Sequence, residues 1–292
     1  MRKTTLVAAG AALVLTLTAC SGNSGTAEPA AAGSQTQAAG LASPFTDAVQ
    51  LASASKQGTE KSKSAKFSME GSAAGQTLRA TGAMAFDGAN TRFSMTTTAA
   101  GQTTEMRMVD QVMYIKLPAE DQKQMGTDKS WAKISADGTD PISQAMGSAL
   151  SQSAEQSDPS KILEQISKTG RIISSDQTQL DGQQVNHYKV EMDVAKAIDQ
   201  FTSQVPAAAR GKLTDMLKGK DVKLPAELWL DKDNLPVQVT MDQGPMMQAL
   251  GAPAGESKFT MKYSDWGTQV DVTAPPADQV VDLGELMKKA GR

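Results

Sequence analysis

The chain has 292 residues and a formal net charge of -3, with 29 Lys and Arg against 32 Asp and Glu. This mildly acidic balance argues against nucleic acid as a partner, and no polybasic run is present to attract anionic lipid headgroups. With one histidine, the chain lacks the residues for zinc sites built from several histidines, and Cys–His catalysis would need its one cysteine, Cys20, to be a free thiol.

The first residues have the pattern of an export signal. Arg2 and Lys3 are basic, and residues 6–17 are apolar but fall short of the roughly 20 residues that span a bilayer. The stretch LTAC, which ends at Cys20, resembles the bacterial lipobox. We therefore expect residues 1–19 to be removed and Cys20 to carry acyl chains such as palmitate, which anchor an extracytoplasmic protein to the cell membrane. The alternative is an ordinary signal peptide with Cys20 as an incidental thiol.

Small and polar residues fill positions 20–42. Such a composition buries too little apolar surface to offset its ordering entropy, so it is typical of a flexible tether. About 22 residues of flexible chain reach roughly 25 Å, which is enough to hold a domain just off a bilayer. The remaining residues, 43–292, are expected to form a single domain.

The expected elements begin with a helix over 43–57, followed by a Lys-rich break and then by period-two alternation. Glycine-containing turns divide this alternation into long strands. The strands of this meander are predicted at 66–74, 77–87, 90–99, 103–110 and 112–117.

Further elements follow two Asp-Pro starts, at Asp140-Pro141 and Asp158-Pro159, each of which predicts a helix. The turn DKDN at 231–234 lies between two alternating runs and predicts a hairpin. The expected elements are strands at 170–179 and 184–194, helix at 195–218, a hairpin of 225–230 with 235–241, a short helix at 245–251, strands at 257–263 and 269–273, and a terminal helix from about 282. Together they predict an α+β fold, an antiparallel half-barrel with helices on one side.

Catalytic chemistry finds little support in the residues. His187 is out of phase with the apolar positions of its strand, so we expect it to be exposed, which also excludes Ser–His catalysis. Most acids sit beside turns or helix ends, where they cap and solubilise. The turn at 231–234 lacks the glycine and distal glutamate of an EF-hand loop. We therefore expect no enzyme activity, no metal and no cofactor.

Methionine is the more informative residue, because the chain has 16 of them against six Phe, three Tyr and three Trp. Many lie in phase with the apolar side of predicted strands, and the flexible, polarizable thioether suits a cavity that accepts variable acyl chains. An ordinary core is the alternative, and Ala80 and Gly82 either make room for a ligand or receive a helix. The candidate cavity residues are Met69, Leu78, Met84, Phe86, Met95, Met108, Met192, Met241 and Met261.

Several motifs together resemble the LppX/LprG-like lipoproteins of actinobacteria: the lipobox with its tether, GAMAFDG, QVMYIKLP, PAELWLDKDNLPVQVTM and KYSDWGTQVDVTAPP. The resemblance implies a strongly curved antiparallel half-barrel with helices packed on its concave side, similar to the periplasmic lipoprotein carrier and receptor. It also implies an acylated lipid or glycolipid as ligand, and binding or transfer of that lipid as the function. A non-catalytic envelope interaction or sensor module on the same fold is the alternative.

Overall fold

The computed structural model describes residues 40–73, 76–85, 91–99, 101–135, 159–196, 207–252, 255 and 257–290. All of them belong to one compact unit, Gln37–Arg292, which contains every element described below. Residues 1–39, with Cys20, lie outside the described residues, as do Phe86, Asp140-Pro141 and residues 197–206.

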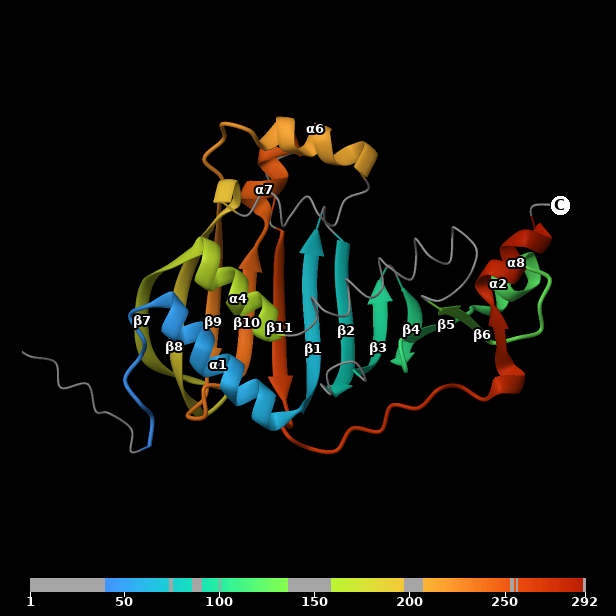
Figure 1. The fold of residues 1–292 in the computed structure, drawn as a ribbon, viewed down its shortest axis with the longest axis horizontal. Helices are drawn as coiled ribbons and strands as arrows, with labels where there is room; N and C mark the ends of the chain where they lie inside the picture. Colours follow the sequence, from blue (N-terminus) through green and yellow to red (C-terminus); the bar gives the residue numbers. More distant parts are fainter. Residues whose placement is uncertain are drawn as a thin grey trace, which may run out of the picture. The chain divides into compact units, whose positions relative to one another are not determined.

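The described strands form a single 12-stranded sheet in the order β12-β6-β5-β4-β3-β2-β1-β11-β10-β9-β8-β7 (Figure 1). All neighbours pair antiparallel except β12 and β6, which are parallel. The α+β class and the antiparallel sheet are thus confirmed. The strands are β1 Ser64–Ala73, β2 Gln76–Ala85, β3 Arg92–Ala99, β4 Gln102–Val109, β5 Val112–Lys116, β6 Trp131–Ser135, β7 Gly170–Leu180, β8 Gln183–Asp193, β9 Lys223–Leu230, β10 Pro236–Asp242, β11 Lys258–Ser264 and β12 Val280–Asp282.

Helix α1 is shifted along the chain from the expected range of 43–57. It starts after Asp47, whose carboxylate accepts hydrogen bonds from the backbone N–H groups of the first turn, and it ends at Lys63, whose φ is 60°. The Lys-rich segment continues the helix because Ser55 and Thr59 extend the buried stripe of Leu51. The helices are α1 Ala48–Ser62, α2 Ala119–Gln124, α4 Pro159–Thr169, α6 Ala207–Leu217, α7 Gly244–Ala249 and α8 Leu283–Ala290, with a 3-10 turn η2 at Ala277–Gln279.

The main core lies between α1 and α4 and one side of the sheet, from β8 through β11 to β1 (Figure 1). Leu51 of α1 and Ile166 of α4 are fully buried against Leu228 and Tyr188 of the sheet. A smaller cluster forms at the other end, where Met108, Met113 and Ile134 pack together with partly buried side chains that include Leu283 of α8. Since both clusters lie inside Gln37–Arg292, this unit carries its own core.

The predicted strand at 269–273 is wrong. Residues 268–276 form no strand; they run from β11 along the lower edge of the sheet to η2 and β12 (Figure 1). We call residues 268–276 the strap. Its alternating valines suggested a strand, but Val272 is buried without a backbone ladder, and the strap is held by side chains instead. The hydroxyl of Ser64 donates to the carbonyl of Thr268, and Arg107 donates to the carbonyl of Thr273.

Strand β6, strand β12 and helix α2 had no counterpart among the expected elements. Strand β6 has five residues, and its apolar side chains do not alternate cleanly, because Trp131, Ala132 and Ile134 are all buried. Strand β12 has three residues and exists through its parallel pairing with β6. Such short elements depend on tertiary contacts more than on local pattern.

Candidate functional site

The strand register places the described candidate residues on one side of the sheet. In paired strands, directly opposite residues point their side chains to the same side. Phe67 pairs with Gly82 and Tyr263, and Met69 pairs with Ala80 and Met261. We call the side that carries Phe67 and packs against α1 and α4 the apolar face. By the same register the apolar face carries Met69, Leu78, Met84, Met95, Met108, Met192, Met241 and Met261.

Three of these candidates belong to the closed core. Met84, Met108 and Met192 are only 2%, 8% and 1% exposed. Met84 and Met192 pack in the main core under the helices, and Met108 packs in the smaller cluster. Their surfaces are already used by the protein's own side chains, which leaves none for a ligand.

The other five candidates lie along the middle of the apolar face and are half-buried: Met69, Leu78, Met95, Met241 and Met261. We call these five residues the methionine stripe. Phe259 also belongs beside it, because it pairs with Met241 and with Gly71 and is half-buried too. Sequence reasoning missed Phe259 although the alternation of 259, 261 and 263 was visible. The stripe is thus a band of adaptable apolar side chains that crosses β10, β11, β1, β2 and β3.

Gly82 makes room neither for a ligand nor for a helix. A Cβ atom added there would lie 2.2 Å from the carbonyl oxygen of Ser94 and 2.5 Å from the ring of Phe67. The ring of Phe67 therefore occupies the space that the glycine leaves. Gly71 is filled in the same way, by the ring of Phe259 at 2.6 Å.

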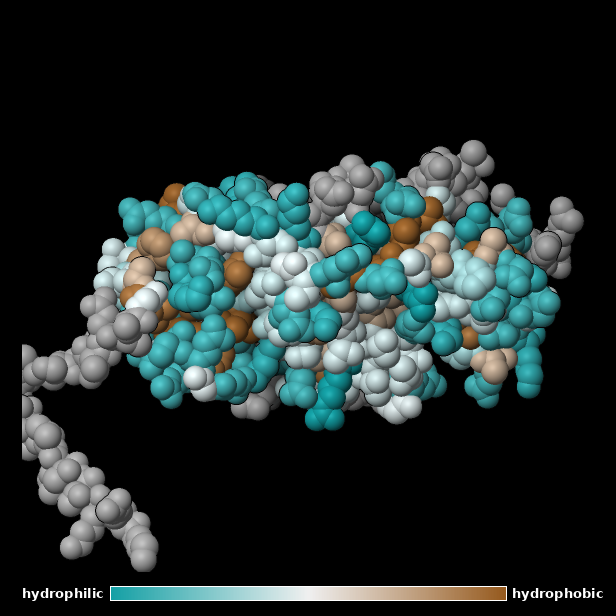
Figure 2. Space-filling view, turned by 90° about the horizontal axis from the view of Figure 1, so that it is seen from below, coloured by the Kyte–Doolittle hydropathy of each residue, from teal (hydrophilic) through white to brown (hydrophobic). Residues whose placement is uncertain are grey.

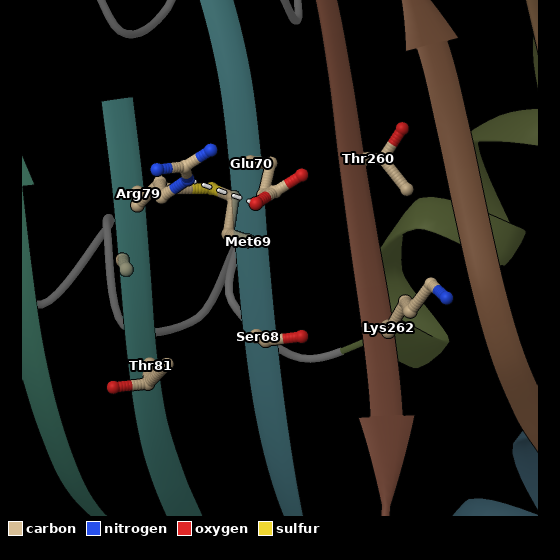
Figure 3. A pocket seen from close by; sticks show the side chains of 8 residues that line it. Ser68, Met69, Glu70, Arg79, Thr81, Thr260 and Lys262 are labelled. Carbon is tan, nitrogen blue, oxygen red and sulfur yellow. Dashed lines mark hydrogen bonds and ion pairs between the residues drawn. The ribbon is translucent and has the colours of Figure 1, made fainter. Parts of the chain in front are cut away.

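The reverse side of the sheet, which we call the polar face, carries hydroxyls and ion pairs. A hollow of about 300 Å³ lies over β2, β1 and β11, where Glu70 binds Arg79 at 2.9 Å and Thr81, Thr260 and Lys262 line the rim (Figure 3). Its charges are already paired, and its hydroxyls suit water as well as any ligand.

The turn between β7 and β8 bends over the polar face. Asp181 of this turn binds Lys262 of β11 at 2.8 Å, although β8, β9 and β10 separate the two elements in the sheet. A second hollow, of about 440 Å³, lies between this turn and β1, β2, β10 and β11. A third, of about 510 Å³, lies between β2, β3 and β4 and the strap. The polar face is therefore covered at two places by the chain itself.

Charged side chains organise the covered part beside the strap. Burial acts to raise the pKa of the Glu105 carboxyl, but the hydrogen bonds and charges of Arg107 and Lys116 bring that pKa below its ordinary value. The Arg107 guanidinium lies 4.7 Å from the ring centre of Trp131, which is 4% exposed. These contacts give the cluster a structural role, in which Arg107 holds Glu105, Trp131 and the strap together.

The expected exposure of His187 is wrong. Its ring is on the polar face as the phase predicted, but the residue is only 9% exposed. Nδ1 lies 3.0 Å from Asp176 Oδ1, Nε2 lies 2.7 Å from Glu227 Oε2, and the ring stacks on Trp229 at 4.6 Å. Side chains of the two neighbouring strands, β7 and β9, cover this histidine, so alternation alone could not reveal its burial.

Neither a metal site nor a membrane-spanning helix is found in the described ranges. No group of three or more His, Cys, Asp or Glu side chains there is arranged to hold an ion. The two carboxylates beside His187 meet opposite ring nitrogens, which point apart and cannot face one ion. No helix in the described part of the chain is long and apolar enough to cross a bilayer.

The DKDN turn forms the expected hairpin between β9 and β10. Asp231 Oδ1 accepts hydrogen bonds from the backbone N–H groups of Asp233 and Leu235, both at 2.9 Å. Burial raises the pKa of the Asp231 carboxyl, against the opposing effect of these hydrogen bonds. The carboxylate is thus committed to closing the turn.

The comparisons with known proteins give one distant relative. No family model matches the chain. A curated protein of Streptomyces griseus, an actinobacterium, is 26% identical over 164 residues and is described as an uncharacterized 31.2 kDa protein in the rplA-rplJ intergenic region. The match covers 56% of this chain and 51% of that protein, so the chain spans about half the length of the relative.

Proposed function

We propose that this chain is an extracytoplasmic lipoprotein, anchored to the cell membrane through Cys20, that binds and transfers acylated lipids on its apolar face. The observation that carries the proposal is the methionine stripe. Its five apolar side chains lie on one face of neighbouring strands and are only half-buried, although Met95, Met241 and Met261 also pack against the main core. A contiguous apolar band beside a closed core is typical of a binding groove.

The chemistry of the stripe suits acyl chains better than it suits a rigid ligand. Met69, Met95, Met241 and Met261 have unbranched side chains that adapt to partners of variable shape. Each CH₂ group of an acyl chain buried against them contributes about 0.8 kcal/mol. Ten such groups therefore supply about 8 kcal/mol before the cost of immobilising the chain is subtracted.

The finer architecture belongs to the same proposal. We take the sheet to be a half-barrel of the LppX/LprG-like kind, with α1 and α4 on its concave side. Burial of side chains from β1, β2, β8, β9, β10 and β11 against these two helices supports it. The actinobacterial source of the distant relative agrees with this family.

Purification with bound lipid tests the proposal directly. Residues 37–292, expressed in an actinobacterial host and analysed by native mass spectrometry, are expected to carry one or more acylated species that organic solvent extracts. Repeated recovery of ligand-free protein would sink lipid binding and would favour the alternative, a non-catalytic envelope interaction module on the same fold.

A matched pair of variants locates the site. Met261→Gln keeps the side-chain volume but places an amide in the stripe, so affinity for a fluorescent fatty-acyl probe is expected to fall roughly tenfold. Thr260→Gln places the same amide group on the polar face of the same strand and is expected to leave the affinity for the probe unchanged. Equal effects of the two substitutions would place the ligand elsewhere.

The anchor needs its own test. Cys20→Ala is expected to abolish incorporation of radiolabelled palmitate and to release the protein from the membrane fraction. Retention of the label by the variant would contradict lipidation at Cys20 without touching the lipid-binding proposal.

A further inference from the structure

We propose that the end of the sheet formed by α6 and α7 is a docking surface for an anionic lipid bilayer. Figure 1 shows both helices at the same end of the strands. The side chain of Lys220, just after α6, donates to the carbonyl of Ala249 in α7, which ties the two helices together. The inference adds a membrane-contact surface to the proposed function and does not depend on the lipid anchor.

The first observation is the exposure of two large apolar side chains there. Met216 of α6 is 44% exposed and Met247 of α7 is 42% exposed. Their neighbours Leu213, Leu217 and Met246 turn inward and pack on the main core, so each helix shows an apolar side chain to water although it also buries others. The view from below shows hydrophilic residues over much of the described surface, with hydrophobic residues between them (Figure 2).

The second observation is the charge around these methionines. Lys212, Lys218 and Lys220 are all exposed, and they outnumber the acids nearby, which are Asp215, also exposed, and Asp221, which is bound by Lys223 at 2.6 Å. These lysines lie within nine residues of one another, on α6 and just after it, and the fold brings α7, which carries Met247, next to them through the contact of Lys220 with Ala249. Exposed apolar side chains ringed by lysines complement the negative headgroups and the acyl boundary of an anionic bilayer.

The third observation is continuity with the methionine stripe. Met241 of the stripe is at the end of β10, and α7 begins three residues later. Leu78 and Phe259 occupy the same end of their strands in register with it. A bilayer seated on α6 and α7 would therefore face the end of the stripe that an acyl chain must enter.

Vesicle flotation of residues 37–292 tests the surface. The protein is expected to float with vesicles that contain phosphatidylglycerol, to float far less with pure phosphatidylcholine vesicles, and to be released by high salt. Met216→Ser combined with Met247→Ser, or Lys212→Gln combined with Lys218→Gln, is expected to weaken binding by roughly five- to tenfold.

The matched control is Val49→Ser with Ile173→Ser, since these side chains are exposed by 59% and 53% at α1 and β7. This pair is expected to leave flotation unchanged, with folding of every variant checked by circular dichroism. Absence of flotation with both vesicle types, or loss of flotation only in the control pair, overturns the proposal. Extraction of bound lipid from the same samples is a separate readout, so failure of docking and failure of lipid binding are distinguished.

Discussion

Gly82 and Phe67 form a cross-strand pair in which the aromatic ring covers the glycine. Adding a methyl group there forces the Phe67 ring and the β2–β3 pairing apart, since the carbonyl of Ser94 is rigid. Gly82→Ala is expected to lower the free energy of unfolding by about 1–3 kcal/mol, measured by urea denaturation. Gly211→Ala is the control, because nothing lies within 4 Å of its added Cβ in helix α6, and a gain of about 0.5–1 kcal/mol is expected. Equal effects of both changes would contradict the packing argument.

His187 links three strands by its two hydrogen bonds and its stack on Trp229. His187→Ala leaves Asp176 and Glu227 without their shared partner, so the free energy of unfolding is expected to fall by about 1–3 kcal/mol. Lys189→Ala, at an exposed position of the same strand, is expected to change it by less than about 0.5 kcal/mol. Chemical denaturation of both variants decides whether the histidine has a structural role.

At the residue scale, the side of the sheet to which a side chain points could be predicted, but its exposed fraction could not. The alternation in β1, β2 and β11 correctly assigned Met69, Leu78 and Met261 to one face, because side-chain direction follows strand period alone. Burial of His187 depends on which side chains of β7 and β9 cover it, and this requires the strand order. No signal in a single sequence supplies that order.

Tyr188 of β8 connects the sheet to the segment before α1, because its hydroxyl accepts a hydrogen bond from the backbone N–H of Phe45 at 3.1 Å. Burial raises the pKa of Tyr188 above its ordinary value of 10.0, and the hydrogen bond from Phe45 opposes this only in part. The folded state holds the phenol proton more tightly than the unfolded state does. The contribution of Tyr188 to the free energy of unfolding is therefore complete below pH 10 and falls as the pH rises above it.

Tyr188→Phe is therefore expected to lose about 1 kcal/mol at neutral pH and to show a shallower alkaline decline in the free energy of unfolding. Absorbance at 295 nm during alkaline titration reports the tyrosinate directly. Burial also raises the pKa of Tyr114, with a contribution from Asp110, so Tyr114→Phe shows how much of the decline comes from that residue. An unchanged alkaline slope in Tyr188→Phe would contradict the assignment.

At the element scale, local signals worked where the chain pairs with its sequence neighbour. The meander from β1 to β5 and the β9–β10 hairpin follow alternation and turn residues, which act within one hairpin. The strand predicted at 269–273 does not form, because the valines of the strap pack without a backbone ladder. Strand β12 was missed because its partner, β6, is about 150 residues away. Long-range pairing leaves no local pattern.

At the scale of the whole unit, the two apolar clusters are unequal. The main core draws on α1, α4, Leu217 of α6 and six strands, whereas the smaller one buries Met108, Met113 and Ile134, with Phe93 packing against both. Strands β4 to β6 are therefore expected to open at a lower free energy than β8 and β9. In hydrogen-exchange mass spectrometry, peptides from 102–135 should exchange before those from 183–193 and 223–230. Simultaneous exchange of all these peptides would mean one cooperative core.

The contacts just before α1 have a mechanical consequence. The carbonyl of Ala42 accepts hydrogen bonds from the side-chain amides of Gln177 and Asn186, and Leu41 is buried. Any tension transmitted along the chain from upstream of Gly40 therefore reaches β7 and β8 first, at the outer edge of the sheet, before it can load α1. Because two amide side chains hold this carbonyl, a pull that frees Ala42 can extend the segment before α1 while leaving the helix and its core in place.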